Sequence, residues 1–364
     1  MNTLHVDLGA DWRGGQNQAL LLLEGLRARG HGAELIAVEG APLAERARRQ
    51  NFVIHPVSKR TRRARAMLRI RKLLLENKFD LVHAHDAHSL TAAWFARAHT
   101  RTVVIASRRA AFPLQTNQLA LQRYRKTRRV LAVSALVAEQ VQAAGIPGEQ
   151  VTVVHDGVML PPALTPEQRR TARAQWGIES NQQLLGCLGA LEPNKGHDLL
   201  LRALPLLRDR FPNARLLLAG DGPRRDSLET LAEKLGITGA VQFLGDVSDL
   251  TLFFNALDMF LFPSVREGLG SALLLAMAHG VPPVAFAGGA TPEIIENQRN
   301  GLLAETTDPE ALAISAAHLL GDPGLARRLG AAARDTIEQR FTVNHMVENT
   351  LRVYHQAFKQ ETPA

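Results

Sequence analysis

Short apolar runs alternate along the whole chain with longer segments in which apolar residues recur at helical spacing. In the first half the runs lie at residues 4–8, 33–38, 52–57, 81–84, 102–106, 130–133 and 151–154, and in the second half at 184–188, 215–219, 241–244, 259–262 and 283–286. Strands separated by helices predict a parallel sheet that is covered by helices on both faces. The chain is therefore expected to be an α/β protein with two doubly wound, Rossmann-like domains.

The boundary between the two expected domains falls in a segment that contains several prolines. Residues 155–168 include Pro161, Pro162 and Pro166, and proline fixes φ and removes an amide donor, which favours an extended connection. We therefore expect an N-terminal domain at residues 1–163 and a C-terminal domain at residues 164–340. Three helical segments follow the last expected strand, at 309–320, 323–339 and 343–358, which suggests that the tail packs outside the second sheet. In two facing domains of this kind, the carboxyl ends of the strands would line one interdomain cleft.

Charge is divided unevenly between the two expected domains. Residues 1–163 contain 24 Lys and Arg against 12 Asp and Glu, whereas residues 164–364 contain 19 against 23. A basic first half favours phosphate-rich partners such as membrane headgroups, phosphorylated glycans or nucleic acid. The single cysteine, Cys187, excludes an internal disulfide, and no apolar run approaches the roughly 20 residues of a membrane span. Together with an N-terminus that does not resemble a leader peptide, these features favour the cytoplasm.

Two glycine-containing stretches are candidate anion sites, because each follows an expected strand and precedes a helix. In Arg13-Gly14-Gly15, glycine admits a ligand close to the backbone, and the helix-start amides favour an anion; a plain tight turn is the alternative. Gly189 ends the first strand of the second half, and Lys195 opens the next helix, where its ammonium can reach a diphosphate. A solvated surface lysine is the alternative for that stretch.

The most specific stretch runs from residue 262 to residue 271, where a strand ends in a glycine-rich loop and a helix begins. Glu267 can accept hydrogen bonds from sugar hydroxyls, while the amides after Gly268 can face a phosphate. Gly288-Gly289, after the next strand, offers a further point where a ligand can approach the backbone. The alternative is a run that merely caps a helix.

Taken in order, these motifs resemble the retaining glycosyltransferases of family 4, also called group 1, which have the GT-B fold. The resemblance covers nearly the whole chain and is densest from residue 188 to residue 303. It rests on Gly189, Lys195-Gly196, Gly220-Asp221-Gly222-Pro223, Glu267-Gly268-Leu269-Gly270, Gly288-Gly289 and Pro292-Glu293. The segment from Arg340-Phe341 to Tyr354 resembles the terminal helix of the family, so residues 341–364 are expected to cross back onto the N-terminal domain.

The resemblance implies transfer from a nucleotide-diphosphate sugar with retention at the anomeric carbon and without a metal ion or other cofactor. No Asp-x-Asp pair occurs in the sequence, which agrees with a site that lacks a divalent ion. Lys195 and backbone amides would stabilise the departing diphosphate, and Glu267 would hold the donor sugar. The residues expected to be catalytic are Lys195, Glu267 and His85, and those expected to bind the donor are Gly14, Gly15, Gly189, Lys195, Gly222, Val247, Arg266, Glu267, Gly268, Leu269, Gly270, Ser271 and Leu275.

Two positions depart from the family pattern. Ala190 stands where an arginine is usual, and Leu275 stands eight residues after Glu267, where a second glutamate usually binds the ribose. Each loss weakens donor binding by roughly 1–3 kcal/mol, the scale of a charge-assisted hydrogen bond. Arg266 and Arg224 are candidates to replace the missing cation. The departures keep two alternatives open: a degenerate relative that binds a nucleotide sugar without turnover, and a nucleotide-sugar epimerase of the same fold.

A histidine-rich strand end and a pair of arginines are the candidate acceptor residues of the first domain. Alternation along the strand puts His83 and His85 on one face, with His85 and the following Asp86 at the strand end. We expect His83 to be buried and structural and His85 to be an acceptor-site or general-base residue; a zinc site would lack a fourth ligand. The next strand ends in two arginines where the family commonly has a histidine. The residues expected to bind an anionic acceptor are Arg13, His85, Asp86, Arg108 and Arg109.

A basic stretch in the first domain has two interpretations that remain open. Residues 59–72 contain eight basic residues and no acid, with Met67, Ile70 and Leu74 at helical spacing. The stretch is either a solvated helix face or a surface that docks the domain on an anionic membrane, where each basic side chain adds about 1 kcal/mol. Nucleic acid is not expected as a partner, because no recognised binding motif accompanies the charge. The resulting hypothesis is a glycosyltransferase that acts on a lipid-linked or lipopolysaccharide-type glycan at the inner, cytoplasmic face of the cell membrane.

Overall fold

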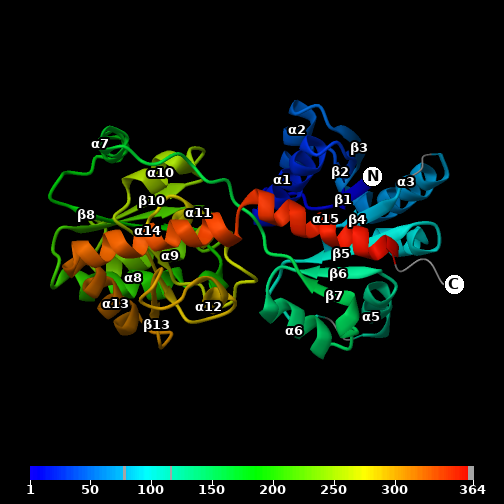
Figure 1. The fold of residues 1–364 in the computed structure, drawn as a ribbon. Helices are drawn as coiled ribbons and strands as arrows, with labels where there is room; N and C mark the ends of the chain where they lie inside the picture. Colours follow the sequence, from blue (N-terminus) through cyan, green and yellow to red (C-terminus); the bar gives the residue numbers. More distant parts are fainter. Residues whose placement is uncertain (77–78, 115–116, 360–364) are drawn as a thin grey trace. The chain divides into compact units, whose positions relative to one another are not determined.

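A computed structural model describes residues 1–76, 79–114 and 117–359. The chain forms two compact units, Met1–Gly157 together with the segment that begins at Val343, and Val158–Thr342. Figure 1 shows that each unit is a sheet with helices packed on it. Residues 360–364, at the end of the expected terminal segment, lie outside the described residues.

The sheet of the first unit has seven parallel strands in the order β3-β2-β1-β4-β5-β6-β7. Their bounds, which differ from the expected ones by only one or two residues, are β1 Asn2–Asp7, β2 Gly32–Val38, β3 Val53–Val57, β4 Leu81–Ala84, β5 Val103–Arg108, β6 Arg129–Ala132 and β7 Val151–Val153. The order reverses between β1 and β4, and doubly wound sheets bind ligands at the carboxyl edge of such a switch point. The loops after β1 and β4 are therefore in the position of a binding site.

The helices of the first unit are α1 Gly14–Ala28, α2 Pro42–Arg49, α3 Arg62–Glu76, α4 Ala87–Phe95, α5 Gln118–Arg125, α6 Ala135–Ala143 and, from the end of the chain, α15 Val343–Lys359. Helices α1 and α15 lie side by side (Figure 1). Val347 and Tyr354 of α15 lie in one buried cluster with Leu22 and Leu26 of α1. A Cβ atom at Gly25 would lie 2.3 Å from Cγ2 of Val347. Glycine at this position therefore allows α1 and α15 to approach closely.

The sheet of the second unit has six parallel strands in the order β10-β9-β8-β11-β12-β13. The strands are β8 Gln183–Leu188, β9 Ala214–Ala219, β10 Val241–Gly245, β11 Met259–Phe262, β12 Pro283–Phe286 and β13 Leu302–Ala304. The helices are α7 Pro166–Gln175, α8 His197–Arg208, α9 Arg225–Lys234, α10 Leu250–Ala256, α11 Ser271–Ala278, α12 Thr291–Ile294, α13 Pro309–Gly321 and α14 Pro323–Arg340. The three-residue β13 was not predicted, because so short a strand carries no recognisable alternation.

The extended connection between the domains ends earlier than the predicted segment 155–168. Helix α7 begins at Pro166 with a capping box, in which Thr165 Oγ1 accepts from the amide of Gln168 at 3.2 Å, and Gln168 Oε1 accepts from the amide of Thr165 at 3.0 Å. Proline at the first helical position loses no hydrogen bond, because that amide has no intrahelical partner. Pro166 therefore starts a helix instead of prolonging the connection.

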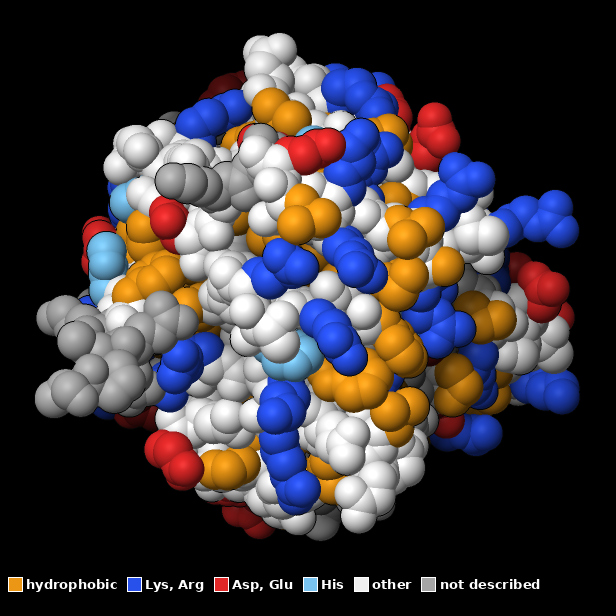
Figure 2. Space-filling model, turned by 90° about the vertical axis from the view of Figure 1, so that its right-hand side faces the viewer, with side chains coloured by type: hydrophobic (Ala, Val, Ile, Leu, Met, Phe, Trp, Pro, Cys, Tyr) orange, Lys and Arg blue, Asp and Glu red, His pale blue; other side chains and the backbone are white. Residues whose placement is uncertain are grey.

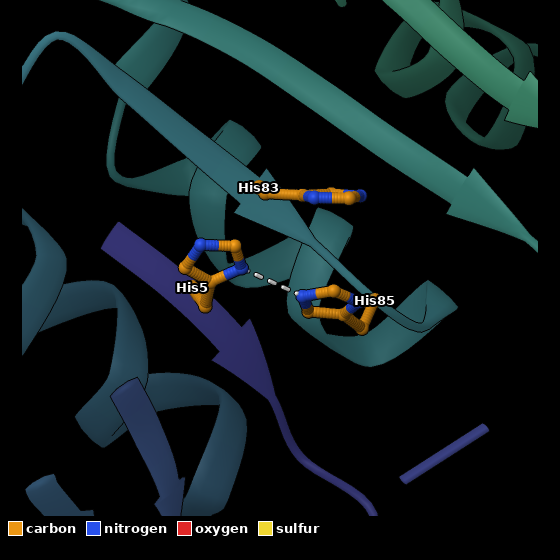
Figure 3. A group of neighbouring side chains, drawn as sticks. All are labelled: His5, His83 and His85. Atoms are coloured by element: carbon orange, nitrogen blue, oxygen red, sulfur yellow. Dashed lines mark hydrogen bonds between the residues drawn. The ribbon is translucent and has the colours of Figure 1, made fainter. Parts of the chain in front are cut away.

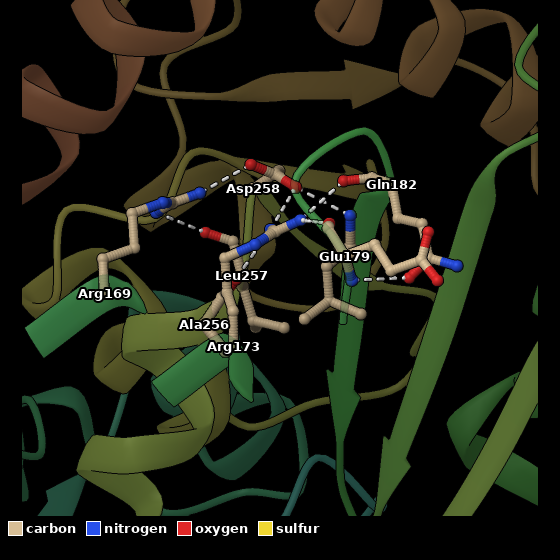
Figure 4. A network of polar contacts seen from close by, with 8 residues as sticks. Arg169, Arg173, Glu179, Gln182, Ala256, Leu257 and Asp258 are labelled. Atoms are coloured by element: carbon tan, nitrogen blue, oxygen red, sulfur yellow. Dashed lines mark hydrogen bonds and ion pairs between the residues drawn. The ribbon is translucent and has the colours of Figure 1, made fainter. Parts of the chain in front are cut away.

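A polar network attaches α7 to the strand starts of the second sheet (Figure 4). Asp258, directly before β11, accepts hydrogen bonds from Arg169 at 2.5 Å, from Arg173 at 3.0 Å and from the amide of Leu184 at 2.7 Å. Arg173 also donates to the carbonyl of Gln182 at 2.6 Å. The network lies at the amino ends of β8 and β11, so it fixes the scaffold at the edge opposite to the loops described next.

Candidate functional site

An ion pair joins two loops at the carboxyl edge of the second sheet. Lys195 ends a short 3-10 turn after β8, and Glu267 lies in the loop between β11 and α11. Lys195 Nζ donates to Glu267 Oε1, and Ser264 Oγ donates to the same carboxylate oxygen at 2.9 Å. The side chains of Lys195 and Glu267 are 24% and 15% exposed, so the pair can be reached by a ligand but is largely desolvated. Two of the residues expected to bind the donor are thus brought together.

Glycines allow the backbone to come this close to the pair. Gly196 has φ +69°, and a Cβ atom there would lie 2.1 Å from the carbonyl oxygen of Pro263. Gly289 has φ +58°, and its Cβ would lie 2.7 Å from the amide nitrogen of Glu267. The positive φ values and the close contacts exclude a larger residue at either position without movement of these loops.

The glycines after β8 and β9 divide into packed and open positions. A Cβ at Gly222 would lie 2.7 Å from the carbonyl oxygen of Leu191, so this glycine is explained by backbone packing. A Cβ at Gly189 would meet no atom within 4 Å. Open space beside Gly189, at the end of β8, is compatible with close approach of a ligand to the backbone, as expected from the sequence.

The remaining expected donor residues surround the start of α11 or lie in the next loop. The three residues before α11 are buried; they are Gly268, Leu269 and Gly270. Ser271 is the first residue of α11, and Leu275 lies one helical turn later and is partly exposed. Val247 is partly buried in the loop after β10. Arg266 is exposed, whereas Arg224 Nη1 lies 3.3 Å from Asp198 Oδ1. Of the two candidates to replace the missing cation, Arg266 therefore keeps its charge available for a ligand.

The sequence did not point to Ser264 or His197, which also lie at this edge. Ser264 is buried and orients Glu267 through the hydrogen bond given above. His197 follows Gly196 and begins α8, and burial, followed by the nearby charge of Lys195, lowers its pKa to about 4. A neutral imidazole therefore lies beside Lys195 at neutral pH. A serine before the glycine-rich loop and a histidine after Lys195-Gly196 carry no distinctive sequence signal.

Three buried histidines lie side by side in the first unit (Figure 3). His5 on β1 is the register partner of His83 on β4, and His85 directly follows β4. The ring centroids of His83 and His85 are 4.1 Å apart, which confirms that the two side chains share a face. His83 bonds to Tyr354 of α15 at 2.6 Å and to Ser107 at 2.8 Å. His83 is thus buried and structural, but His85 is nearly as buried.

The hydrogen bonds of this cluster fix the ring tautomers. Thr3 Oγ1 donates to the carbonyl of Gly32 at 2.9 Å, so it accepts from Nε2 of His5, also at 2.9 Å. Nδ1 of His5 therefore accepts from Nε2 of His85 at 2.9 Å, which leaves Nδ1 of His85 as an acceptor. Burial lowers the pKa of His5 to about 3 and the pKa of His85 well below its usual range, so both rings are neutral.

Arg109 connects this cluster to the other acceptor candidates. Its Nη1 lies 3.4 Å from Nδ1 of His85, and its Nε donates to Asp156 Oδ1 at 2.9 Å. Its Cδ lies 4.0 Å from the Cβ position of Gly15, at the start of α1. The first turn of α1, the end of β4 and the end of β5 therefore meet at Arg109. A metal ion among the three histidines would displace the hydrogen bond between His5 and His85 and those that His83 makes to Tyr354 and Ser107. The geometry beside the Arg109 cation therefore favours hydrogen-bonded imidazoles over a metal centre.

The other residues of the expected acceptor set have mainly structural contacts. Asp86 caps α4 by accepting from the amides of His88 at 2.7 Å and Ser89 at 3.0 Å, and it accepts from the amide of Leu8 at 2.8 Å. Arg108 donates to the carbonyl of Phe112 at 2.5 Å. Arg13 occupies the residue before α1.

Asp7 is a further candidate that the sequence did not reveal. It ends β1, is buried, and accepts hydrogen bonds from the amide of Gly9 at 2.9 Å and from Gln16 at 3.1 Å. Burial and the charge of Asp86 raise its pKa to about 6. A carboxyl group that titrates near neutral pH is thus located at the switch point between β1 and β4.

Family models match both halves of the chain. The model described as "Glycosyl transferases group 1" matches residues 168–336, and the model described as "Glycosyltransferase Family 4" matches residues 12–160. The chain therefore belongs to the group 1, or family 4, glycosyltransferases.

Two curated relatives and one solved structure illustrate the similarity. A D-inositol 3-phosphate glycosyltransferase of Streptomyces scabiei is 30% identical over 281 residues, which are 70% of this chain and 63% of the relative. A GDP-mannose-dependent alpha-(1-6)-phosphatidylinositol monomannoside mannosyltransferase of Mycolicibacterium smegmatis is 34% identical over 178 residues, 46% of each chain. The chain thus spans less than two-thirds of either relative. The crystal structure of Anabaena HepE in complex with UDP and glucose has a TM-score of 0.84 at 20% identity, covering 97% of this chain and 99% of that chain, and this likeness shows the GT-B fold.

Proposed function

We propose that the protein is a retaining glycosyltransferase that moves a sugar from a nucleotide-diphosphate sugar onto an anionic, lipid-linked or lipopolysaccharide-type glycan, without a metal ion. The observation that carries the proposal is the pair of Lys195 and Glu267 among the glycine-rich loops of the second unit. An ammonium and a carboxylate at one place match the two ends of such a donor, a diphosphate and a sugar.

The donor would change the partners of this pair. A diphosphate at Lys195 would take over the ammonium from Glu267 and free the carboxylate for sugar hydroxyls, while Ser264 keeps that carboxylate in place. As the bond between the anomeric carbon and the diphosphate breaks, negative charge grows on the leaving oxygen, next to Lys195 and the first amides of α11. If retention is achieved in one step, the acceptor hydroxyl attacks the anomeric carbon from the side of the leaving group, so the departing diphosphate is within reach of the hydroxyl proton.

The acceptor would bind to basic residues of the first unit. The two relatives named above act, by their names, on inositol 3-phosphate and on a phosphatidylinositol monomannoside, and both acceptors carry phosphate. Arg109 is 18% exposed and is held by Asp156, which presents its remaining donors in a fixed orientation. The acceptor hydroxyl would meet Nδ1 of His85, since its other ring nitrogen is bonded to His5.

The first unit would dock on the anionic inner face of the cell membrane. Leu68 and Leu75 of α3 are 60% and 63% exposed, and Phe95 of α4 is also exposed. Figure 2, which shows the side of the first unit that carries α3, has Lys and Arg side chains gathered around hydrophobic ones. Apolar side chains among cations fit a lipid surface with anionic headgroups. Among the described helices, none has the length and apolar character that crossing a bilayer requires.

A panel of UDP-, GDP- and ADP-sugars tests the donor half of this proposal. At least one nucleotide sugar should raise the melting temperature, because a ligand that binds the native state stabilises it by mass action. The same sugar should then be transferred to a phosphorylated polyol or glycolipid in the presence of EDTA, and NMR of the product should show the anomeric configuration of the donor. A product with the inverted anomeric configuration would refute retention, and a strict requirement for a divalent ion would refute metal independence.

A donor-binding relative without turnover is the second candidate. Ala190 and Leu275 motivate it, since Arg224 is engaged with Asp198 and Leu275 offers no hydrogen bond to a ribose. Donor binding without transfer over a range of acceptors would favour it. In that case Leu275→Glu should increase nucleotide affinity about tenfold, as expected for a regained charge-assisted hydrogen bond. An epimerase would instead convert the donor with no acceptor present.

A further inference from the structure

A hollow of about 570 Å³ opens in the first unit beside the start of α3. Its lining residues are Lys59, Arg60, Thr61, Arg62, Arg63, Ala64 and His88. Four of these seven residues are cations, and none is acidic. Pockets of roughly 300–1,000 Å³ bind small ligands, so the hollow has room for a phosphate group and the polyol or sugar that carries it.

The hollow lies at the carboxyl edge of the first sheet. Its lining begins two residues after β3 ends, and His88 lies in the first turn of α4, which follows β4. Arg62 Nη1 donates to the carbonyl of Leu8, directly after β1, at 3.1 Å. Arg62 thus ties the hollow to the switch point between β1 and β4, where such sheets bind their ligands.

The cations of the lining repel one another unless an anion is present. Within the part of the chain that the structure describes, Lys59, Arg60, Arg62 and Arg63 form no ion pair with a carboxylate. Helix α3 has no acidic residue in its first turn, and cations at that end oppose the helix dipole. This concentration of charge destabilises the folded chain, and a bound anion would relieve it.

The pKa of His88 depends on the charges around the hollow. Its pKa is lowered by partial burial and by the positive charges of Arg62, Arg63 and Arg123, while Asp86 acts in the opposite direction. An anion among these cations would offset their effect on the imidazole. The resonances of His88 therefore report directly on occupancy.

We infer that this hollow is a subsite for a phosphate group carried by the acceptor, with Lys59, Arg60 and Arg63 as its ligands. Arg62 provides the fourth cation from a position fixed by the carbonyl of Leu8. The inference rests on the proposed function, because it assigns the anionic part of the acceptor to a place apart from Arg109 and His85. It also separates the start of α3, which binds the phosphate, from the exposed Leu68 and Leu75, which would face the lipid.

Imidazole NMR of the full-length protein tests the subsite. Inorganic phosphate and myo-inositol 1-phosphate should each shift the His88 resonances in a saturable manner, and the phosphate ester should bind at least as tightly. Arg60→Ser with Arg63→Ser should weaken both at least tenfold. Arg69→Ser with Arg71→Ser removes the same charge from positions of α3 outside the hollow and should change the affinity less than twofold.

Further measurements identify the source of the phosphate and test the proposed function separately from the subsite. If vesicles of phosphatidylcholine with phosphatidylglycerol shift His88 and the soluble ester does not, the phosphate belongs to a lipid headgroup. No saturable shift with any of these probes, or equal weakening by the two double variants, would overturn the subsite. Thermal shift with UDP and GDP in the same samples reports the donor site separately. Phosphate binding without nucleotide binding would keep the subsite and remove the proposed function.

Discussion

Lys195 and Glu267 form an ion pair although 72 residues separate them in the sequence. The contact exists because β8 and β11 are neighbours in the second sheet, so the loops after them leave its edge side by side. Ser264 donates to the same oxygen of Glu267 and keeps the carboxylate oriented. The two charged groups of the proposed donor site therefore lie side by side in the folded chain.

Loss of either member of this pair should remove activity and leave the fold intact. Lys195→Ala should lower kcat/KM at least 100-fold, because the leaving diphosphate loses its cation, and Glu267→Ala should do the same through the sugar. Both side chains are partly exposed, so the melting temperature should fall by no more than a few degrees. The exposed Lys234 and Glu233 of α9 provide matched controls, and full activity of Lys195→Ala would refute the assignment.

Replacement by alanine should destabilise the protein far more at Gly196 than at Gly177. Gly196 and Gly177 have similar φ values of +69° and +64°, but an added Cβ at Gly177 meets no atom within 4 Å, whereas at Gly196 it would strike Pro263. Gly177→Ala should therefore cost about 1 kcal/mol of unfolding free energy, for the left-handed backbone alone. Gly196→Ala should cost roughly 1–3 kcal/mol more and weaken donor binding, because Lys195 moves with the loop. Equal effects in urea unfolding would contradict this account.

Gly25 should limit how closely α15 packs on α1. Alanine normally stabilises a helix relative to glycine by about 1 kcal/mol, but at this position its Cβ would overlap Val347. We expect Gly25→Ala to destabilise the protein by about 1–2 kcal/mol, and Val347→Ala to relieve the overlap in the double variant. A double-mutant cycle should then show a favourable coupling of about 1–3 kcal/mol. Additive effects would mean that the two helices adjust without strain.

Stability should fall as the pH drops below 6.5, because His197 and three histidines of the first unit are buried and stay neutral in the fold. The pKa of His5 is lowered to about 3 by burial, and the pKa values of His83 and His85 are also well below 6.5. The unfolded chain therefore binds more protons than the folded chain in this range. Each of these histidines lowers the free energy of unfolding by about 1.4 kcal/mol between pH 8 and pH 5.5. Asp7 and Asp156 act in the opposite direction, because burial raises the pKa of both carboxyls, that of Asp7 to about 6, but two carboxyls offset only part of the loss from the histidines.

Urea unfolding at pH 8 and pH 5.5 measures this dependence. His85→Gln should reduce the difference in unfolding free energy between the two pH values by about 1.4 kcal/mol, because one of these histidine titrations is gone. His355→Gln, an exposed residue of α15 in the same unit, is the matched control. An unchanged difference in His85→Gln would show that His85 is not held neutral by the fold.

The strands and the loop motifs that contain Lys195 and Glu267 could be predicted from the sequence, because both depend on local patterns of residues. The expected strands match the structure closely, and Lys195 and Glu267 were found from glycine spacing and family resemblance. The partners of Arg109 could not be found in this way. Asp156 lies 47 residues away, and only the order of the strands brings it near.

The burial of Asp7 and the hollow beside α3 likewise cannot be predicted from a local sequence pattern. Asp7 resembles an ordinary strand end, and its raised pKa depends on burial and on Asp86, which the sheet places near it. The basic run at 59–72 was evident, but its division into a hollow and an exposed apolar face depends on how α3 packs.

Calorimetry with nucleoside diphosphates tests the central claim most directly, since it isolates diphosphate binding at Lys195 from the acceptor. The wild-type protein should bind UDP or GDP, and Lys195→Ala should weaken that binding at least tenfold, as expected for a lost charge-assisted contact. Lys234→Ala should bind like the wild type. Equal affinities of the Lys195→Ala and Lys234→Ala variants, or no binding of any nucleoside diphosphate, would contradict a donor site in the second unit.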